Sequence, residues 1–447
     1  MQLDAGIDDQ RTAGAGKGDL AKGNHEGADY SGADALEFPE IPTNDAMIKQ
    51  ISTDQLKPGM YIHDLNCGWL DHPFLSNAFQ VRDQATVDKI VSLGIHEVYI
   101  DTVKGADVWA GRTQQEVNAD LDRRLSEIAS RGPDKPVTTA LKEEVARARR
   151  LHGEAHKIVR NIMDDARLGQ QIQVDRMEPL VENMVDSIFR NQDALLPLAL
   201  LKKHDNYTFA HSVSVCALLV AFGRGLKLER AVIKDMALGG LLHDVGKARI
   251  PDAILNKPGK LSDDEFMRMK SHVDLGIAAL QQTPDLPDIA LRVTAEHHER
   301  FDGSGYPNKL SGGGISLYGQ IAAIVDVYDA ISSDRVYHKG MSPTQALKKL
   351  LEWSSHHFDP RLVQVFIRAI GIYPTGTLVQ LESKRLGVVV EQNEKNLLAP
   401  VVRIFYHAGQ RHYIPPENVD LARSMDRIAS FESFDKWKID PYQWLPG

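Results

Sequence analysis

The sequence predicts a mainly α-helical protein, with a small α+β domain before the helical block and a β-rich module after it. Three observations support this fold class. Apolar residues recur at helical spacing through most of residues 166–372. Short apolar runs bounded by turn residues lie on both sides of this block, in residues 44–112 and 373–447. The length of 447 residues suits roughly two to four domains.

Composition excludes several classes of protein. Hydrophobic residues make up 43% of the chain and charged residues 25%, the balance of a globular protein. No apolar run approaches the roughly 18 residues that cross a bilayer, so no membrane span is expected. The net charge of −9 argues against a broad nucleic-acid-binding surface. Cys67 and Cys216 are too far apart for a disulfide framework, and a cytoplasmic location is expected.

The elements before the helical block follow from local pattern. Residues 1–43, with seven glycines in the first 40 positions, are expected to form a disordered tail. Strands are predicted over residues 47–51, 60–63 and 97–101, and a helix over 81–93 with Asp83 as its N-cap. No catalytic constellation is visible there, so packing, sensing or dimerisation is the expected role of this domain.

The remaining elements continue in order. Residues 113–165, rich in Arg, Glu, Ala and Leu, predict a solvated helical linker interrupted at Pro133 to Pro136. In the block that follows, Ser262 with Glu265 and Ser342 with Gln345 form the capping boxes that begin helices. After residue 372 the apolar period becomes two, which predicts strands over residues 377–381, 387–390 and 401–406.

The helical block places five histidines and two aspartates against apolar helical stripes. A single histidine in such a place is usually a core residue, but a carboxylate buried like Asp326 is costly unless it is paired or binds metal. A mixture of imidazoles and carboxylates suits iron, manganese or zinc better than magnesium. The seven candidates are His211, His243, Asp244, His272, His297, His298 and Asp326.

Several segments, in this order, resemble the HD-GYP family, the branch of the HD phosphohydrolase superfamily that hydrolyses cyclic dinucleotides. The resemblance covers about residues 200–370 and implies an all-helical HD-type phosphohydrolase domain. The flanking domains are also similar to those of one HD-GYP subgroup. The segments that carry the resemblance are His243-Asp244-Val245-Gly246-Lys247, the run His-His-Glu-Arg-Phe-Asp-Gly-Ser-Gly-Tyr-Pro from His297 to Pro307, and Asp326-Val327-Tyr328-Asp329-Ala330.

The resemblance implies a centre of two divalent metal ions, with iron or manganese as the expected metal. His211, His243, Asp244 and Asp326 would hold one ion. His272, His297 and His298 would hold the other, and Asp244 would bridge both. A water between two such ions becomes hydroxide near neutral pH and can attack phosphorus, so Asp244 is expected to be catalytic.

The resemblance also implies how the substrate is held. Lys247, expected to be catalytic as well, would reach the scissile phosphate, and the planar fork of Arg335 would bind a second phosphate. The loop that includes Asp302, Gly305 and Tyr306 would place the tyrosine against a guanine.

Two positions depart from the family pattern. His338, a further expected substrate contact, stands where the family usually has lysine or arginine. Tyr207 stands where some members have a glutamate that recruits a third metal. Two ions per chain are therefore expected.

These features predict a metal-dependent phosphodiesterase that opens cyclic di-GMP. One alternative is hydrolysis of another cyclic dinucleotide, such as cyclic GMP–AMP. Another is a catalytically silent receptor that binds the nucleotide or a diguanylate cyclase partner of the GGDEF type. The presence of every implied ligand favours the enzyme, and a homodimer is one compatible assembly.

Overall fold

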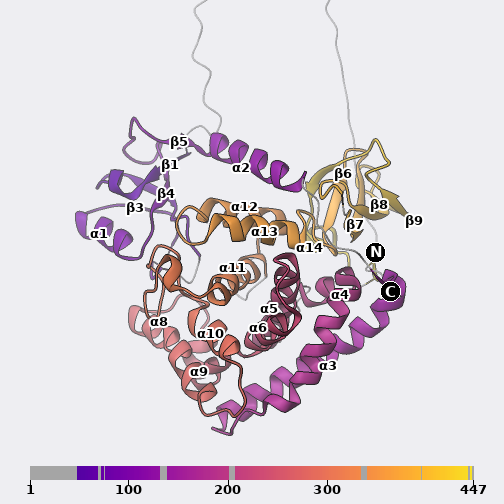
Figure 1. The fold of residues 1–447 in the computed structure, drawn as a ribbon. Coiled ribbons are helices and arrows are strands. Elements are labelled where there is room, and N and C mark those ends of the chain that lie inside the picture. Colours follow the sequence, from indigo (N-terminus) through magenta and orange to yellow (C-terminus); the bar gives the residue numbers. More distant parts are fainter. Residues whose placement is uncertain are drawn as a thin grey trace, which may run out of the picture. The chain divides into compact units, whose positions relative to one another are not determined.

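The structure, a computed structural model, describes residues 48–68, 72–74, 76–130, 138–200, 207–333, 340–393, 395–440 and 443–444 (Figure 1). The predicted tail over residues 1–43, Pro133 to Pro136, Arg335 and His338 lie outside the described residues, as does the side chain of Tyr207. Within the described ranges, no helix combines the length and the apolar character that crossing a bilayer requires.

The N-terminal domain is a five-stranded antiparallel sheet with the strand order β3-β2-β4-β1-β5 and one helix, α1. The predicted strands are present within one residue and the predicted helix within three, and the Asp83 carboxylate caps α1 by accepting from the Thr86 amide at 2.8 Å. Sequence pattern missed β3 and β5, because two residues cannot display a period. The bounds are β1 Ile48–Ser52, β2 Tyr61–Asp64, β3 Phe79–Gln80, α1 Gln84–Ser92, β4 Glu97–Asp101 and β5 Arg112–Thr113.

Helices form the body of the protein (Figure 1). Buried apolar residues of α2 and α3 belong to the same hydrophobic core as the later helices, so one face of the predicted linker is buried. The five-segment division of the chain stays a prediction. The bounds are α2 Gln114–Ala129, α3 Leu141–Arg167, α4 Glu178–Leu200, α5 Tyr207–Gly225, α6 Arg230–Leu242, α7 Asp252–Leu255, α8 Asp263–Lys270, α9 His272–Leu280, α10 Asp288–Glu296, α11 Leu317–Ser332, α12 Pro343–Trp353 and α13 Pro360–Ile370.

Local sequence signals mark the starts of two helices in this block. Both predicted capping boxes are formed, at Ser262 for α8 and at Ser342 for α12. His272 does not continue the helix that begins at Asp263, although its apolar neighbours would suggest so: α8 ends at Lys270, and α9 begins at His272. The Ser271 hydroxyl donates to the Arg268 carbonyl, a local bond that competes with the helical pattern.

A second five-stranded antiparallel sheet follows the helices, with the order β10-β6-β7-β8-β9. The three predicted strands are present as β6, β7 and β8. β9 was missed because most of its residues are exposed and it contains Pro415 and Pro416, so no alternation marks it. The bounds are β6 Leu378–Leu381, β7 Arg385–Glu391, β8 Val401–His407, β9 His412–Asp420, β10 Ile428–Phe431 and α14 Phe434–Trp437.

Candidate metal centre

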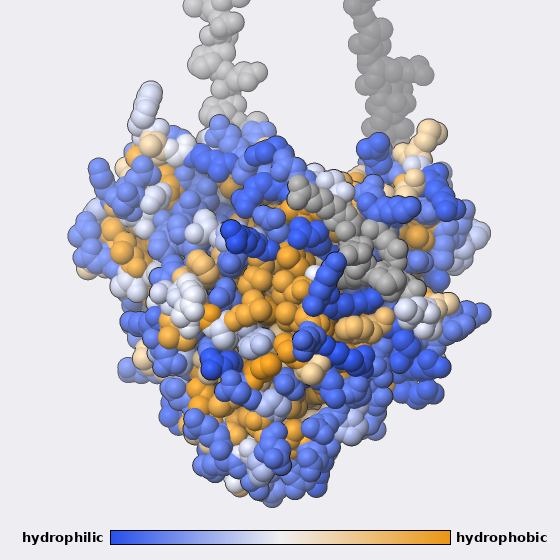
Figure 2. All heavy atoms as spheres, viewed as in Figure 1, coloured by the Kyte–Doolittle hydropathy of each residue, from blue (hydrophilic) through white to orange (hydrophobic). Residues whose placement is uncertain are grey.

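The seven predicted ligands meet between α5, α6, α9, α10 and α11. His211 lies early in α5, His243 and Asp244 end α6, and His272 begins α9. His297 and His298 follow α10, and Asp326 lies in the middle of α11. All are buried except His298, which is partly exposed. Figure 2 shows the side of the molecule that faces the viewer in Figure 1. On that side, mainly polar residues lie around the rim and apolar residues lie over the middle of the helical body.

Asp244 presents a different oxygen to each half of the cluster. Its Oδ2 lies 3.5 Å from His211 Nε2 and 3.4 Å from His243 Nε2. Its Oδ1 lies 3.4 Å from His272 Nε2. The possible ligand atoms form three groups, and within each group the atoms lie within 4.8 Å of one another. They are His211, His243 and Asp326; His272, His297 and His298; and His243, Asp244 and His297.

Backbone carbonyls orient three of the imidazoles. The Nδ1 atoms of His243, His272 and His297 each lie 2.8 Å from the carbonyl oxygen three residues earlier. A carbonyl only accepts hydrogen bonds, so Nδ1 carries the proton and the Nε2 lone pair faces the cluster. A histidine just after the last turn of a helix can make this bond. The end of the helix therefore fixes the tautomer that leaves Nε2 free to bind a metal.

Asp329, which the sequence interpretation did not assign, orients His211. Its Oδ2 lies 2.5 Å from His211 Nδ1, and the Ser214 hydroxyl donates to its other oxygen. A carboxylate behind a ligating histidine fixes the ring and raises its basicity. The signal was available in sequence, because Asp329 is three residues after Asp326 on the same helix and therefore lies close to the same face.

Burial and charge set the protonation of the ligands. Burial lowers the pKa of His272 to about 4 and that of His297 to about 3. Burial alone would raise the pKa of the Asp244 carboxyl, but the nearby Lys247 and His243 hold that pKa well below its usual range. These imidazoles are therefore neutral and Asp244 is ionised at neutral pH, as metal binding requires.

The buried donor set fits a metal cation. Asp244 Oδ1 accepts no hydrogen bond from the described residues, although it is fully buried. A buried carboxylate oxygen without a donor is costly. His272 Nε2 lies close to this oxygen but presents a lone pair to it, because the proton of the His272 ring is on Nδ1. A divalent ion between such atoms would compensate them all.

Predicted substrate residues lie beside this cluster. Lys247 Nζ is 2.6 Å from Asp244 Oδ2 and remains partly exposed. The Tyr306 ring stacks on the His298 ring at a centroid distance of 4.6 Å. A side chain at Gly305 would meet the Arg300 amide nitrogen at 2.4 Å, so this close turn requires glycine. Asp302 lies in the same loop, with its Oδ1 accepting from the Ser304 amide at 2.8 Å.

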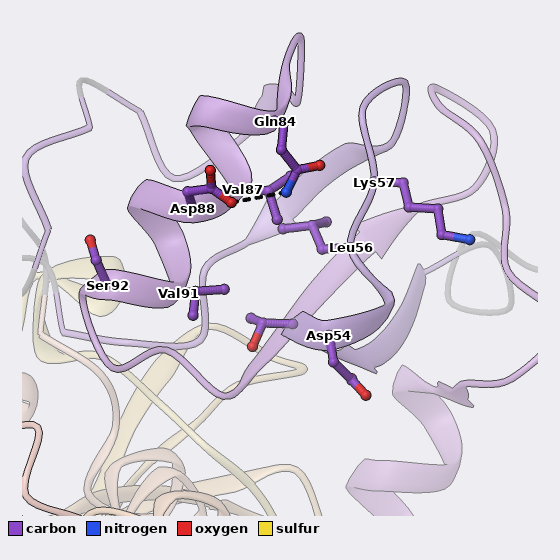
Figure 3. Close-up of a pocket in the computed structure, with 9 residues that line it drawn as sticks. Asp54, Leu56, Lys57, Gln84, Val87, Asp88, Val91 and Ser92 are labelled. Atoms are coloured by element: carbon purple, nitrogen blue, oxygen red, sulfur yellow. Dashed lines mark hydrogen bonds between the residues drawn. The ribbon is translucent and has the colours of Figure 1, made fainter.

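A separate hollow of about 540 Å³ lies in the N-terminal domain, between the short 3-10 helix η2 (Thr53–Gln55) and α1 (Figure 3). Its described lining includes Leu56, Val87 and Val91, with Gln84 bonded to Asp88 at 2.9 Å. None of the predicted metal ligands is among these lining residues. The chemistry of the His/Asp cluster therefore does not take place in this hollow.

Comparisons with known proteins agree with the geometry. A profile described as "HD domain" matches residues 196–362, and a domain of unknown function, DUF3391, matches residues 48–177. A cyclic di-GMP phosphodiesterase of Pseudomonas aeruginosa is 41% identical over 88% of this chain and 94% of its own length.

Two further matches are more limited in coverage or identity. A 3′3′-cGAMP-specific phosphodiesterase of Vibrio cholerae is 43% identical over 28% of this chain and 24% of its own length. The solved structure of Bd1817, an HDG"Y"P protein of Bdellovibrio bacteriovorus, aligns with 16% identity and a TM-score of 0.42, covering 71% of this chain and 98% of that one. The match along nearly the whole Pseudomonas relative, together with the HD-domain profile, decides the family: this chain belongs to the HD-GYP family of phosphodiesterases.

Proposed function

We propose that this protein hydrolyses cyclic di-GMP at a centre of two divalent ions. The observation that carries the proposal is the placement of Asp244, which offers one oxygen to His211 and His243 and the other to His272. Two cations a few ångströms apart need a shared anion, and a fully buried carboxylate with a low pKa supplies it.

The chain's own residues have distinct roles in this proposal. His211, His243, Asp244 and Asp326 would hold one ion, and His272, His297 and His298 would hold the other together with Asp244. Such ions, when bound, lower the pKa of a water and neutralise charge on phosphoryl oxygens. Lys247, which bonds Asp244 and is itself partly exposed, places a positive charge where the scissile phosphate would enter. The preponderance of imidazole ligands supports iron, manganese or zinc rather than magnesium, and the family resemblance favours iron or manganese among these.

Tyr306 and the loop around it supply the base contact. The ring lies against His298, with Lys270 Nζ 4.9 Å from its centroid, so it borders the ligand cluster. An aromatic face at this position can stack on a guanine. The name of the Pseudomonas relative supports cyclic di-GMP, and that of the Vibrio relative makes cyclic GMP–AMP the comparison substrate.

The experiment uses full-length protein purified without oxygen, with metal content measured beside turnover of cyclic di-GMP and 3′3′-cyclic GMP–AMP. We expect about two ions per chain, iron or manganese, and faster turnover of cyclic di-GMP. Asp244→Asn should retain the fold but lose metal and activity, because an amide cannot bridge two cations. Binding of the nucleotide without turnover in the metal-loaded protein would contradict the enzyme and favour a receptor.

Cellular context adds further proposals. Cys67 and Cys216 lie buried as thiols, which suits a reducing compartment, and we place the protein in the cytoplasm. A GGDEF-type cyclase partner and a homodimer stay predictions. Pull-down with purified cyclase and light scattering of the full chain would test them.

A further inference from the structure

The turn between α1 and β4 of the N-terminal domain touches the loop that carries Tyr306. We call residues 302–307 the substrate loop. Gly94 has φ +71°, and a Cβ on it would lie 2.3 Å from the Ser304 Cβ. Glycine is therefore required twice at this position, for its backbone conformation and for the close approach. Because residue 94 has no side chain, the turn and the substrate loop lie in direct contact.

A hydrogen bond between side chains joins the two parts at this contact. His96 Nε2 lies 2.6 Å from Asp302 Oδ2, while Asp302 Oδ1 accepts from the Ser304 amide. One oxygen of Asp302 thus shapes the loop, and the other bonds the N-terminal domain. The Asp302 side chain is 15% exposed and the His96 side chain is 41% exposed, so water screens this bond in part.

His96 is itself held in place. Its carbonyl accepts from the Thr53 amide at 2.8 Å, and the Thr53 hydroxyl donates to the Ile95 carbonyl at 2.9 Å. Its ring stacks on the His356 ring beyond the end of α12, with centroids 4.2 Å apart. A fixed backbone and a stacked ring leave His96 few alternative positions, so its bond can restrain Asp302.

The far end of the substrate loop is held by the metal side of the site. The Tyr306 amide donates to the His298 carbonyl at 3.1 Å, and the two rings stack. The Glu299 carboxylate accepts from the Asn308 and Leu310 amides at 2.7 and 2.9 Å. The loop is therefore held at both ends, by the residues that follow α10 and by His96.

We propose that His96 is a positioning residue that fixes the substrate loop through Asp302, so that the N-terminal domain completes the substrate site. The identity of the substrate in this inference rests on the proposed function. His96 acts on Tyr306 through the loop and leaves the metal ligands untouched. Substrate affinity should therefore depend on the N-terminal domain even though the chemistry lies in the helical body.

The kinetic test compares three variants of the full chain. His96→Ala should raise the KM for cyclic di-GMP about threefold to tenfold, with kcat and metal content near wild type, because a partly shielded charge-assisted bond is lost. His96→Gln should recover part of the loss, since its amide can still donate to Asp302. Lys89→Ala removes an ion pair to Asp263 at 3.1 Å between the same two parts and should leave KM unchanged. An equal rise in KM for Lys89→Ala, or loss of metal from His96→Ala, would overturn the proposal.

A second measurement does not depend on turnover. Amide hydrogen exchange of residues 302–307 should become faster in His96→Ala than in wild type, without ligand. Gly94→Ala should have the same effect, and adding Ser304→Gly should reverse part of it by removing the clash. If wild type does not open cyclic di-GMP, the proposed function fails, while exchange still decides the role of His96. Unchanged exchange in a folded His96→Ala protein would overturn it.

Discussion

Asp329 shows how a residue outside the ligand set can control a ligand. It bonds His211 Nδ1 and leaves Nε2 directed at Asp244 and Asp326. We expect Asp329→Ala to weaken metal binding about tenfold to hundredfold, because the ring loses its orientation and basicity. Asp329→Asn should weaken it less, since an amide oxygen can still accept from Nδ1. Metal titration monitored by competition with a chelator measures both, and equal affinity of all three proteins would exclude this role.

The buried imidazoles predict acid sensitivity of the metal-free protein. The pKa values of His272 and His297 in the folded state are about 4 and about 3, against 6.5 when exposed. Below pH 6.5 the unfolded chain binds these protons first, so the free energy of unfolding falls as pH falls. As pH falls from 6 to about 4, each of the two histidines should lower the free energy of unfolding by roughly 1.4 kcal/mol per pH unit.

Urea unfolding of the metal-free protein at several pH values measures this slope. The raised pKa of His243, caused by Asp244 and Asp326 against the effect of burial, does not cancel it, because below pH 6.5 that histidine is charged in both states. In His297→Gln, the free energy of unfolding should depend less steeply on pH, because the contribution of His297 is lost. A stability independent of pH between 4 and 6.5 would show that these rings are not held neutral.

At the scale of elements, α12 joins the N-terminal sheet to the helical body. Buried Glu352 of α12 accepts from Tyr99 of β4 at 2.6 Å and from Gln50 of β1 at 2.9 Å. Lys349 bonds the other oxygen at 3.0 Å. Residues just past the end of this helix also contact the residue before the substrate loop, because the Phe301 amide donates to the His357 carbonyl at 2.9 Å.

We expect Glu352→Ala to reduce the free energy of unfolding by about 2–4 kcal/mol, because it leaves the buried Tyr99 hydroxyl without its acceptor and leaves the Gln50 amide with Glu97 alone. Chemical denaturation measures the loss. Glu382→Ala, on an exposed turn after β6, is the matched control and should cost little. A loss for Glu352→Ala as small as that of the control would mean that the domain contact contributes little to stability.

At the scale of the whole molecule, part of the C-terminal sheet packs into the core of the helices, while its other buried residues form a cluster of their own. Leu378, Val388 and Phe405 belong to the same buried cluster as residues of α2 to α13. Between the two parts, the buried Asp193 of α4 accepts from the Thr375 hydroxyl at 2.7 Å and from the Gln392 amide at 3.1 Å. Parts of a protein that share one hydrophobic core are expected to unfold together.

We therefore expect the helical body and the C-terminal sheet of the metal-loaded protein to unfold in one thermal transition. Far-ultraviolet circular dichroism reports mainly the helices. Fluorescence of a Trp69→Phe, Trp353→Phe double variant reports mainly the sheet side, through Trp437 and Trp444, since the remaining Trp109 is fully exposed in the folded chain. The two midpoints should coincide. A separate, lower fluorescence midpoint would show that the sheet unfolds as an independent domain.

The sequence by itself determined the features that depend on near neighbours along the chain. The capping boxes at Ser262 and Ser342, the N-cap Asp83 and the strands with alternating apolar residues all depend on contacts within a few positions. The seven ligand candidates were also recognisable, because imidazoles and carboxylates on apolar stripes are costly without a compensating role. The structure then placed all seven together.

Only the tertiary structure decided the contacts between distant segments. Asp329 meets His211 across 118 residues, and His96 meets Asp302 across 206. Strands β3, β5 and β9 exist because a neighbouring strand pairs with them, and their own residues carry little pattern. A local pattern records propensity and burial but not which distant group shares the buried space. The orientation of the ligands and the support of the substrate loop therefore depend on the folded chain.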